Sequence, residues 1–153
     1  MLNTDLLLAA TLLFAGMLTG FEFAIHYGVG APPQVLSEEA QVRLRQAMVR
    51  RLRVLAPALF FPALGCGIAL SFRDRHLSTL WPNGCAVALL LIWILIRALR
   101  TVPVNSATLE WHPLNPPANW REQVERTERF HGIAVWAAVL AFLCFLLPAM
   151  RYR

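Results

Sequence analysis

The sequence predicts an all-α integral membrane protein, in which four transmembrane helices form an antiparallel bundle within a single domain, 1–153. Two observations lead to this fold class. Of the 153 residues, 58% are hydrophobic, and the mean hydropathy of +0.53 exceeds what a soluble domain of this size hides in its core. Four apolar segments also approach the roughly 20 residues needed to cross about 30 Å of hydrocarbon. We expect these spans at about 6–27, 54–72, 82–99 and 133–150.

Breakers and caps define the connections between the spans. The first span has no basic n-region and no A-x-A site, so we expect it to be retained, and it ends at Gly28, Gly30, Pro32 and Pro33. Ser37 before two glutamates predicts an N-cap, and the arginine-rich stretch that follows predicts an amphipathic extension before helix two. The short turn 73–76 predicts a hairpin of helices two and three, and the long Pro/Trp-rich connection 101–130 predicts an ordered loop.

The charged residues indicate which partners the chain has and how it is oriented in the membrane. All 14 basic residues are arginines and the formal charge is +5, but the apolar spans argue against a nucleic-acid partner and favour the lipid bilayer. Nine arginines flank the spans on the side of loops one and three, against four on the other side. The excess predicts a cell-membrane protein with both termini non-cytoplasmic. A small-residue stripe on helix one predicts a homo-oligomer contact through Gly16, Gly20, Ala24 and Gly28.

Ionisable residues gather where helix one ends, helix two begins, helix three ends and helix four begins, and an antiparallel bundle brings these points to one membrane face. Glu22 and Arg97 lie deepest, so we expect both to face the interior, since an unpaired charge in a bilayer costs at least about 2.5 kcal/mol. With His26 and His131 they form the predicted catalytic set, and we assign no metal ligand. The predicted substrate-binding residues are Arg53, Arg100, Asn105, Trp111, Trp120 and Arg126.

Structural roles compete with these functional ones. Glu22 is equally well explained as the partner of an arginine in a structural ion pair, and His26 as a histidine satisfied at the interface. At least one of the three arginines Arg50, Arg51 and Arg53 is expected to anchor the chain to lipid headgroups. The tryptophans of the long loop fit either an aromatic belt at the interface or a lid over a flat apolar ligand. Both interpretations stay open at this point.

The second half of the chain resembles the small four-helix membrane proteins grouped with the anthrone oxygenases. The residues that carry the resemblance are Val-Pro-Val-Asn at 102–105, Trp111, Pro116-Pro117 with Trp120, and Arg126-Thr-Glu-Arg-Phe-His131-Gly132. In the first half, Gly16, Gly20 and Glu22, and Val54-Leu55-Ala56-Pro57 after the arginine-rich stretch, are similar too. Many relatives have an arginine three residues after the His131 position, where this chain has Ala134.

The resemblance implies oxidation of anthrone to anthraquinone by molecular oxygen, without an established cofactor. A base removes an acidic ring proton, cations stabilise the enolate, and oxygen attacks the ring. By position, His131 or His26 would be the base, Glu22 its orienting group and Arg97 or Arg126 the stabilising cation, with Trp111 and Trp120 as a stacking surface. The residues by themselves identify no cofactor.

Two functional hypotheses follow. The first is a small membrane oxygenase or oxidoreductase-like protein acting on a flat, lipophilic, anthrone- or quinol-like compound. The second is a non-catalytic membrane protein that binds a quinone, haem or lipid, or stabilises a membrane complex. Only the first needs a working base, so loss of that base separates the two.

Overall fold

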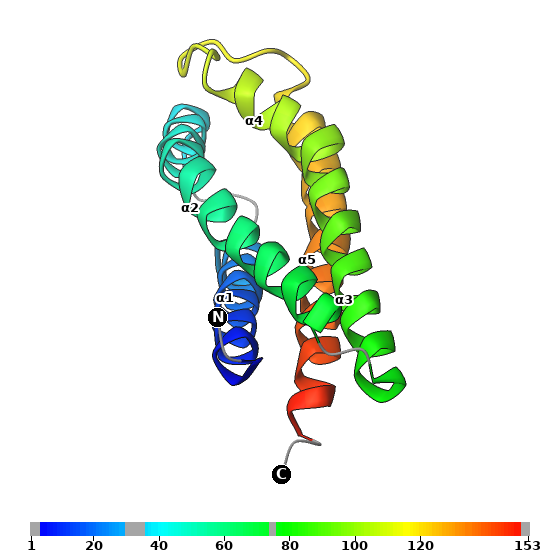
Figure 1. Ribbon diagram of the computed structural model, residues 1–153. Helices are drawn as coiled ribbons and strands as arrows, with labels where there is room; N and C mark the ends of the chain where they lie inside the picture. The colour runs from blue at the N-terminus through cyan, green and yellow to red at the C-terminus, as the bar shows by residue number, and fades with distance from the viewer. Residues whose placement is uncertain (1–3, 30–35, 74–75, 151–153) are drawn as a thin grey trace.

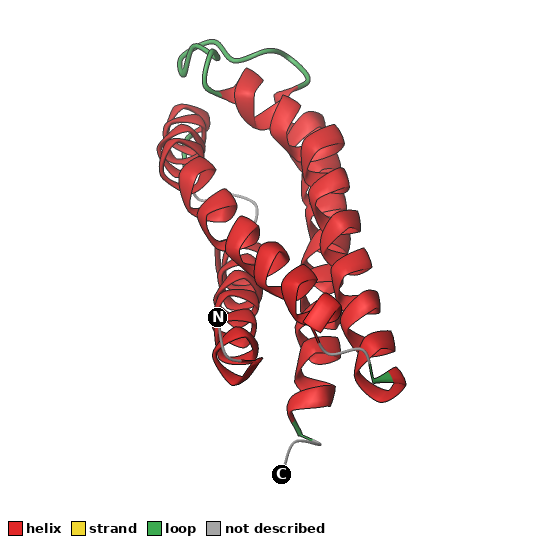
Figure 2. Cartoon of the chain, in the orientation of Figure 1, coloured by secondary structure: helices red, strands yellow, loops and turns green. Residues whose placement is uncertain are grey.

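The computed structural model describes residues 4–29, 36–73 and 76–150, and within these ranges it is almost entirely helical (Figures 1 and 2). The elements in chain order are α1 (Thr4–Phe23), the π-helical turn η1 (Ala24–Val29), α2 (Glu38–Arg73), α3 (Leu77–Ile96), the π-helical turn η2 (Arg97–Thr101), α4 (Val102–Thr108) and α5 (Trp120–Ala149). The breakers Gly30, Pro32 and Pro33, and Asp74 and Arg75 of the predicted turn, lie outside the described residues.

The four long helices run alternately up and down, which confirms the predicted all-α four-helix bundle (Figure 1). Each of the four is long and apolar enough to cross a membrane, so the chain is a multi-pass membrane protein. α1 packs on α2, and α3 packs on α5. The two pairs diverge toward the end that carries α4 (Figure 1). The polar residues described below lie at that end.

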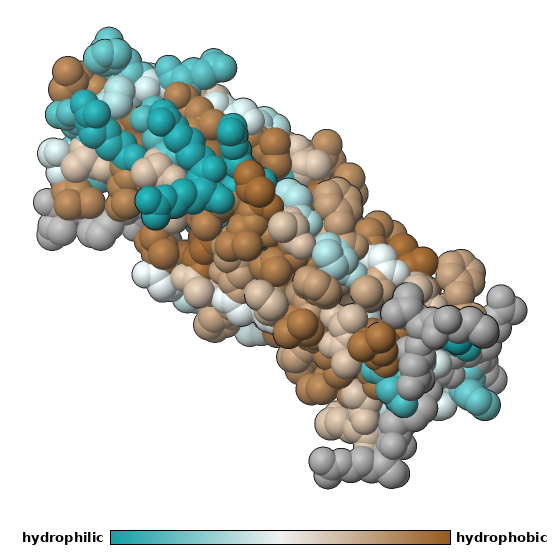
Figure 3. All heavy atoms as spheres, turned by 60° about the vertical axis from the view of Figure 1, so that its left-hand side comes forward, coloured by the Kyte–Doolittle hydropathy of each residue, from teal (hydrophilic) through white to brown (hydrophobic). Residues whose placement is uncertain are grey.

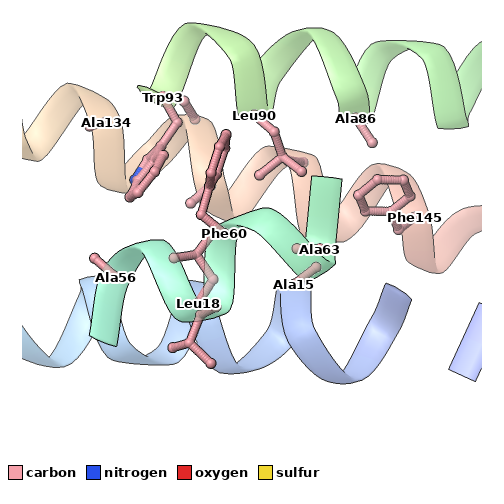
Figure 4. Packing of buried hydrophobic residues seen from close by; sticks show 14 residues of the cluster. Ala15, Leu18, Ala56, Phe60, Ala63, Ala86, Leu90, Trp93, Ala134 and Phe145 are labelled. Carbon is pink, nitrogen blue, oxygen red and sulfur yellow. The ribbon is translucent and has the colours of Figure 1, made fainter. Parts of the chain in front are cut away.

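An apolar core joins all four helices in the middle of the bundle (Figure 4). Phe60 of α2 stacks on Trp93 of α3, with ring centroids 4.9 Å apart. Farther along, Gly67 receives the Phe145 ring so closely that a Cβ at position 67 would lie 2.6 Å from it. A glycine at position 67 therefore lets the Phe145 ring pack directly against the α2 backbone at this end of the bundle.

The N-terminus of α2 matches its prediction. The backbone N–H of Ala40 donates to the Ser37 hydroxyl at 3.3 Å, which confirms the N-cap. The helix then continues for 36 residues, so the expected amphipathic extension and the second span form one continuous α2. Exposed Glu39 and Arg43 pair one turn apart on its outer side.

The third connection is shorter than predicted. We expected a loop from Thr101 to Phe130, but helical structure continues to Thr108 and resumes at Trp120, which leaves 109–119 as the loop (Figure 2). Pro103 is the second residue of α4, directly after the wide turn η2. Buried residues Trp120, Val124 and Thr127 recur at helical spacing, which explains the early start of α5.

The surface is apolar around the middle and hydrophilic toward the end where α2 begins (Figure 3). Large exposed side chains of the middle include Leu13, Phe61, Leu91 and Leu95, as expected for a surface facing lipid. Of the small-residue stripe, Gly16 is covered within the chain, because a Cβ there would lie 3.2 Å from the Phe142 ring. The remaining members, Gly20, Ala24 and Gly28, are exposed.

Candidate functional site

Two π-helical turns flank the site, and each carries a predicted site residue. His26 lies in η1, and Arg97 begins η2. In η2 the backbone N–H of Val102 donates to the carbonyl of Arg97, five residues earlier. Wide turns of this kind are rare and are often found at functional sites.

The wide turn η2 affects which residues of the third span line the cavity. Trp93, Arg97, Thr101 and Asn105 all line the same cavity, and each follows the previous one by four residues. In a regular α-helix, three consecutive four-residue steps drift by roughly 120° around the axis. The wider turn removes part of this drift, so that α3, η2 and α4 present one continuous polar edge.

Glu22 is the most buried charge of the described residues, with an exposed fraction of 0%. Its Oε2 atom lies 3.0 Å from Nε2 of His131 on α5 and 3.4 Å from Nη1 of Arg97. Arg97 also lies over the Trp93 ring, 5.4 Å from its centroid. The predicted inward orientation of Glu22 and Arg97 is therefore confirmed.

His131 contacts a second carboxylate through its other ring nitrogen. Its Nδ1 lies 3.6 Å from Oε2 of Glu128, one turn earlier on α5. The same oxygen lies 3.7 Å from Nδ1 of His26, and the two imidazole rings meet edge to face at 5.3 Å. The four residues predicted as the catalytic set thus converge, and Glu128 joins them.

Arg45 of α2 closes the network from the opposite helix pair. Its Nη1 donates to Oε1 of Glu128 and its Nη2 to Oδ1 of Asn105, both at 3.3 Å. Arg45 is 8% exposed, so its charge depends on these partners. The contact links α2, α4 and α5 across the space between the two helix pairs.

The formal charges of this network balance. Glu22 and Glu128 are matched by Arg45 and Arg97, so the cluster is neutral while both imidazoles are neutral. Balanced pairing makes charged groups tolerable at membrane depth. The two histidines stand outside this balance while their rings are neutral.

A cavity of about 350 Å³ lies between the two helix pairs, beside this network. This volume is at the lower end of the roughly 300–1,000 Å³ typical of ligand pockets. Its apolar wall comes from Ile25, Val29, Leu44, Met48, Val49, Leu52, Ala56, Pro57, Trp93, Ile94, Val102 and Leu109. Its polar members are Arg45, Arg53, Arg97, Thr101, Asn105, Ser106, Thr127, Glu128 and His131. The cavity suits a small apolar ligand with one polar end.

The predicted substrate-binding residues divide into two groups. Arg53 and Asn105 line the cavity, whereas Arg100 and Arg126 are exposed and do not. The Arg100 guanidinium instead lies over the Phe130 ring, 5.0 Å from its centroid. Position near the correct helix end was therefore insufficient to place a side chain in the cavity.

Trp111 and Trp120 are buried but lie away from the cavity lining. They form a separate apolar cluster with Val42 and Val124, and their ring centroids are 6.4 Å apart. Gln46 of α2 donates to the carbonyls of Thr108 and Trp111, both at 2.9 Å. The tryptophans therefore fasten the 109–119 loop to α2 and α5.

Glu128 and Arg45 are absent from the set predicted from the sequence. A signal for Glu128 was present, because residues three apart share one helix face and Glu128 precedes His131 by three. Arg45 carries a weaker signal: Gln41, Val42, Arg45 and Gln46 are all buried, so the inner face of this turn is mostly polar. Hydrophobic periodicity does not reveal a polar inner face.

No model of a known protein family, no curated protein and no solved structure matches the chain. The fold and the site define its class: a multi-pass membrane four-helix bundle with a polar network of arginine, glutamate and histidine beside an apolar cavity.

Proposed function

We propose that the chain is a small membrane oxygenase that acts on a flat, lipophilic, weakly acidic aromatic compound of the anthrone or quinol type. The observation that carries the proposal is the largely apolar cavity of about 350 Å³ with His131 and Arg97 at its polar edge. The residues that resemble the anthrone oxygenases add support, because His131 and Asn105 belong to them and both line this cavity.

The proposed chemistry begins with proton transfer. In the neutral ring, a hydrogen bond from Nε2 to Glu22 leaves the Nδ1 lone pair of His131 to accept a ring proton of the substrate. Arg97 stabilises the resulting enolate by its charge, and Asn105 contacts the substrate oxygen. Arg53 also lines the cavity and supplies a second cation for an anionic substrate.

Molecular oxygen is the oxidant in this proposal. For anthrone, one oxygen atom forms the new carbonyl bond at the ring carbon, and the two hydrogens of that carbon leave with the other oxygen atom as water. Anthrone and dioxygen thus give anthraquinone and water, a four-electron oxidation of the ring carbon balanced by reduction of dioxygen. No further reductant is required.

The same proposal includes a location in the cell membrane with both termini non-cytoplasmic. The arginine excess beside the spans supports this orientation, because positive residues are retained on the cytoplasmic side. A second copy of the chain would pack on the exposed Gly20, Ala24 and Gly28.

The test is turnover of anthrone by the purified chain in lipid nanodiscs, followed by absorbance and by ¹⁸O transfer from ¹⁸O₂ to the product. His131→Gln should lower turnover by about 100-fold or more, the usual contribution of a general base. The matched control is His112→Gln, in the exposed part of the 109–119 loop. Full activity of His131→Gln would remove His131 from the mechanism.

One observation favours the alternative, a non-catalytic protein that binds a quinone, haem or lipid. Ala134 is fully buried in the apolar core, so this chain has no cation where many relatives of the resembled family carry arginine. Saturable binding of a quinone in the cavity, without oxygen consumption by any anthrone tested, would establish that alternative.

A further inference from the structure

Three possible metal-ligand atoms converge beside the cavity, which is lined by two of the three residues, Glu128 and His131. Oε2 of Glu128 lies 3.6 Å from Nδ1 of His131 and 3.7 Å from Nδ1 of His26. One ligand atom from each of these residues lies within 4.8 Å of the other two. Metal–ligand bonds of about 2.0–2.2 Å separate two ligands of one ion by roughly 3.0–3.8 Å. Both distances from Glu128 fall within that range.

The hydrogen bonds around His131 prepare its Nδ1 for a cation. Nε2 of the ring lies 3.0 Å from Oε2 of Glu22, and an ionised carboxylate can only accept, so the neutral ring carries its hydrogen on Nε2. The lone pair then lies on Nδ1, the nitrogen that is 3.6 Å from Oε2 of Glu128. A carboxylate behind the imidazole of a metal ligand is the usual second partner in such sites.

Glu128 is oriented in the same way. Arg45 occupies Oε1 at 3.3 Å, which leaves Oε2 for the two imidazoles. A distance of 3.6–3.7 Å is too long for a hydrogen bond, so Oε2 and the two Nδ1 atoms surround a point without bonding one another. Nδ1 of His26 is buried and has no hydrogen-bond partner among the described residues.

Gly132 makes room for His26. A Cβ at position 132 would lie 3.1 Å from Nε2 of His26, so a larger residue there would require the ring to shift by a few tenths of an ångström. Trp136, one turn later, donates its indole N–H to the Tyr27 hydroxyl at 3.1 Å. Both contacts lie between η1 and α5, the two elements that carry the imidazoles.

We propose that His26, Glu128 and His131 bind one divalent first-row transition metal ion. Two histidines and one carboxylate leave coordination positions open, and this ligand set is characteristic of ferrous oxygenases. The ion would add two positive charges to an otherwise balanced network, which favours an anionic further ligand. Such an ion lies beyond the proposed function, whose chemistry needs no metal.

The metal site and the base role compete for one lone pair. Nδ1 of His131 either accepts the substrate proton or coordinates the ion. Oxidation of anthrone by metal-free protein would therefore support His131 as base, whereas dependence on added metal would assign His131 to the ion.

The experiment uses the full chain in detergent, with any histidine tag removed and bound metal stripped by a chelator. Co²⁺ is the probe, because its visible absorption reports nitrogen and oxygen ligands. We expect about one Co²⁺ per chain, at least roughly tenfold weaker binding in Glu128→Gln and His26→Asn, and 10- to 100-fold weaker binding in Glu22→Gln. Glu125→Gln, exposed on the same helix, is the matched control and should bind as the unmodified chain does.

Elution volume and helical circular dichroism establish that each variant is folded. If Glu128→Gln does not fold, His26→Asn tests the metal site in its place. Failure of the unmodified chain to bind Co²⁺, or unchanged binding in a folded Glu128→Gln or His26→Asn variant, overturns the proposal. Co²⁺ binding is measured without substrate, so its loss leaves the oxygenase proposal intact. Conversely, metal binding without anthrone turnover would support the metal site and contradict the oxygenase proposal.

Discussion

The Glu22 carboxylate lies 3.0 Å from Nε2 of His131, and this contact joins α1 to α5 across 109 residues of sequence. Arg97 of η2 reaches the same carboxylate oxygen, so one buried atom connects three elements. A charge in this position serves both the stability of the bundle and the orientation of the imidazole.

Glu22→Ala should therefore destabilise the chain by about 3–5 kcal/mol, because it leaves the largely buried Arg97 cation without its carboxylate partner. Glu22→Gln should cost less, since the amide oxygen still accepts from His131 or Arg97. Thermal unfolding in detergent measures both, with Glu125→Ala as the exposed control. Equal stability of Glu22→Ala and the control would contradict a buried pair.

Gly132→Ala should displace His26 without unfolding the bundle. The added methyl would lie 3.1 Å from the ring nitrogen, and overpacking of this kind costs about 1–3 kcal/mol. We expect Co²⁺ affinity to fall by at least roughly tenfold, as it does when a residue that positions a metal ligand is lost. Gly84→Ala is the control, because a methyl group there would meet no neighbouring atom within 4 Å. Unchanged Co²⁺ affinity in Gly132→Ala would argue against His26 as a ligand.

Gly67→Ala should destabilise the closed end of the bundle. The new Cβ would lie 2.6 Å from the Phe145 ring, so the α2–α5 crossing must widen or the ring must rotate, at a cost of about 1–3 kcal/mol. Gly65→Ala, two residues earlier with open space at its Cβ, should be neutral or slightly stabilising. Similar melting temperatures for both variants would show that the crossing adapts freely.

Trp120→Phe tests the role of the tryptophan cluster. The variant keeps most of the buried ring but loses the hydrogen bond from the indole N–H to Glu38, so we expect a loss of about 1 kcal/mol in stability. Ligand affinity should stay unchanged, because Trp120 does not line the cavity. More than a tenfold loss of affinity for a bound quinone would place the indole against the ligand after all.

The fold could be predicted from the sequence because membrane spans are defined by length and hydropathy alone. The convergence of Glu22, His26, Arg97 and His131 followed from the up-and-down order of the spans, which fixes the membrane face where each residue lies. The order of the spans does not determine the rotation of each helix about its own axis, which decides whether a side chain faces the cavity. An apolar span facing lipid on one side and protein on the other has weak periodicity, so Arg100 was expected to bind substrate and lies outside the cavity.

Glu128 and the tryptophans show the same limit in two ways. Glu128 lies on the His131 face of α5, but its pairing depends on Arg45, which comes from a distant helix. Trp111 and Trp120 are buried, as expected of an ordered loop. Their contact with Val42 and Val124, however, depends on how α2 and α5 are placed relative to each other. Tertiary packing of this kind cannot be read from one chain's local pattern.

The wide turn η2 sets the phase between two helices that would otherwise be one. Each residue of an α-helix advances the side chains by about 100°, so deletion of exposed Ala98 would rotate everything after it relative to α3. The buried face of α3, from Thr79 to Trp93, would keep its contacts, while Asn105 would turn away from Arg45. Whichever side chains it carries, this turn thus determines by its length whether the two halves of the third span face the same cavity.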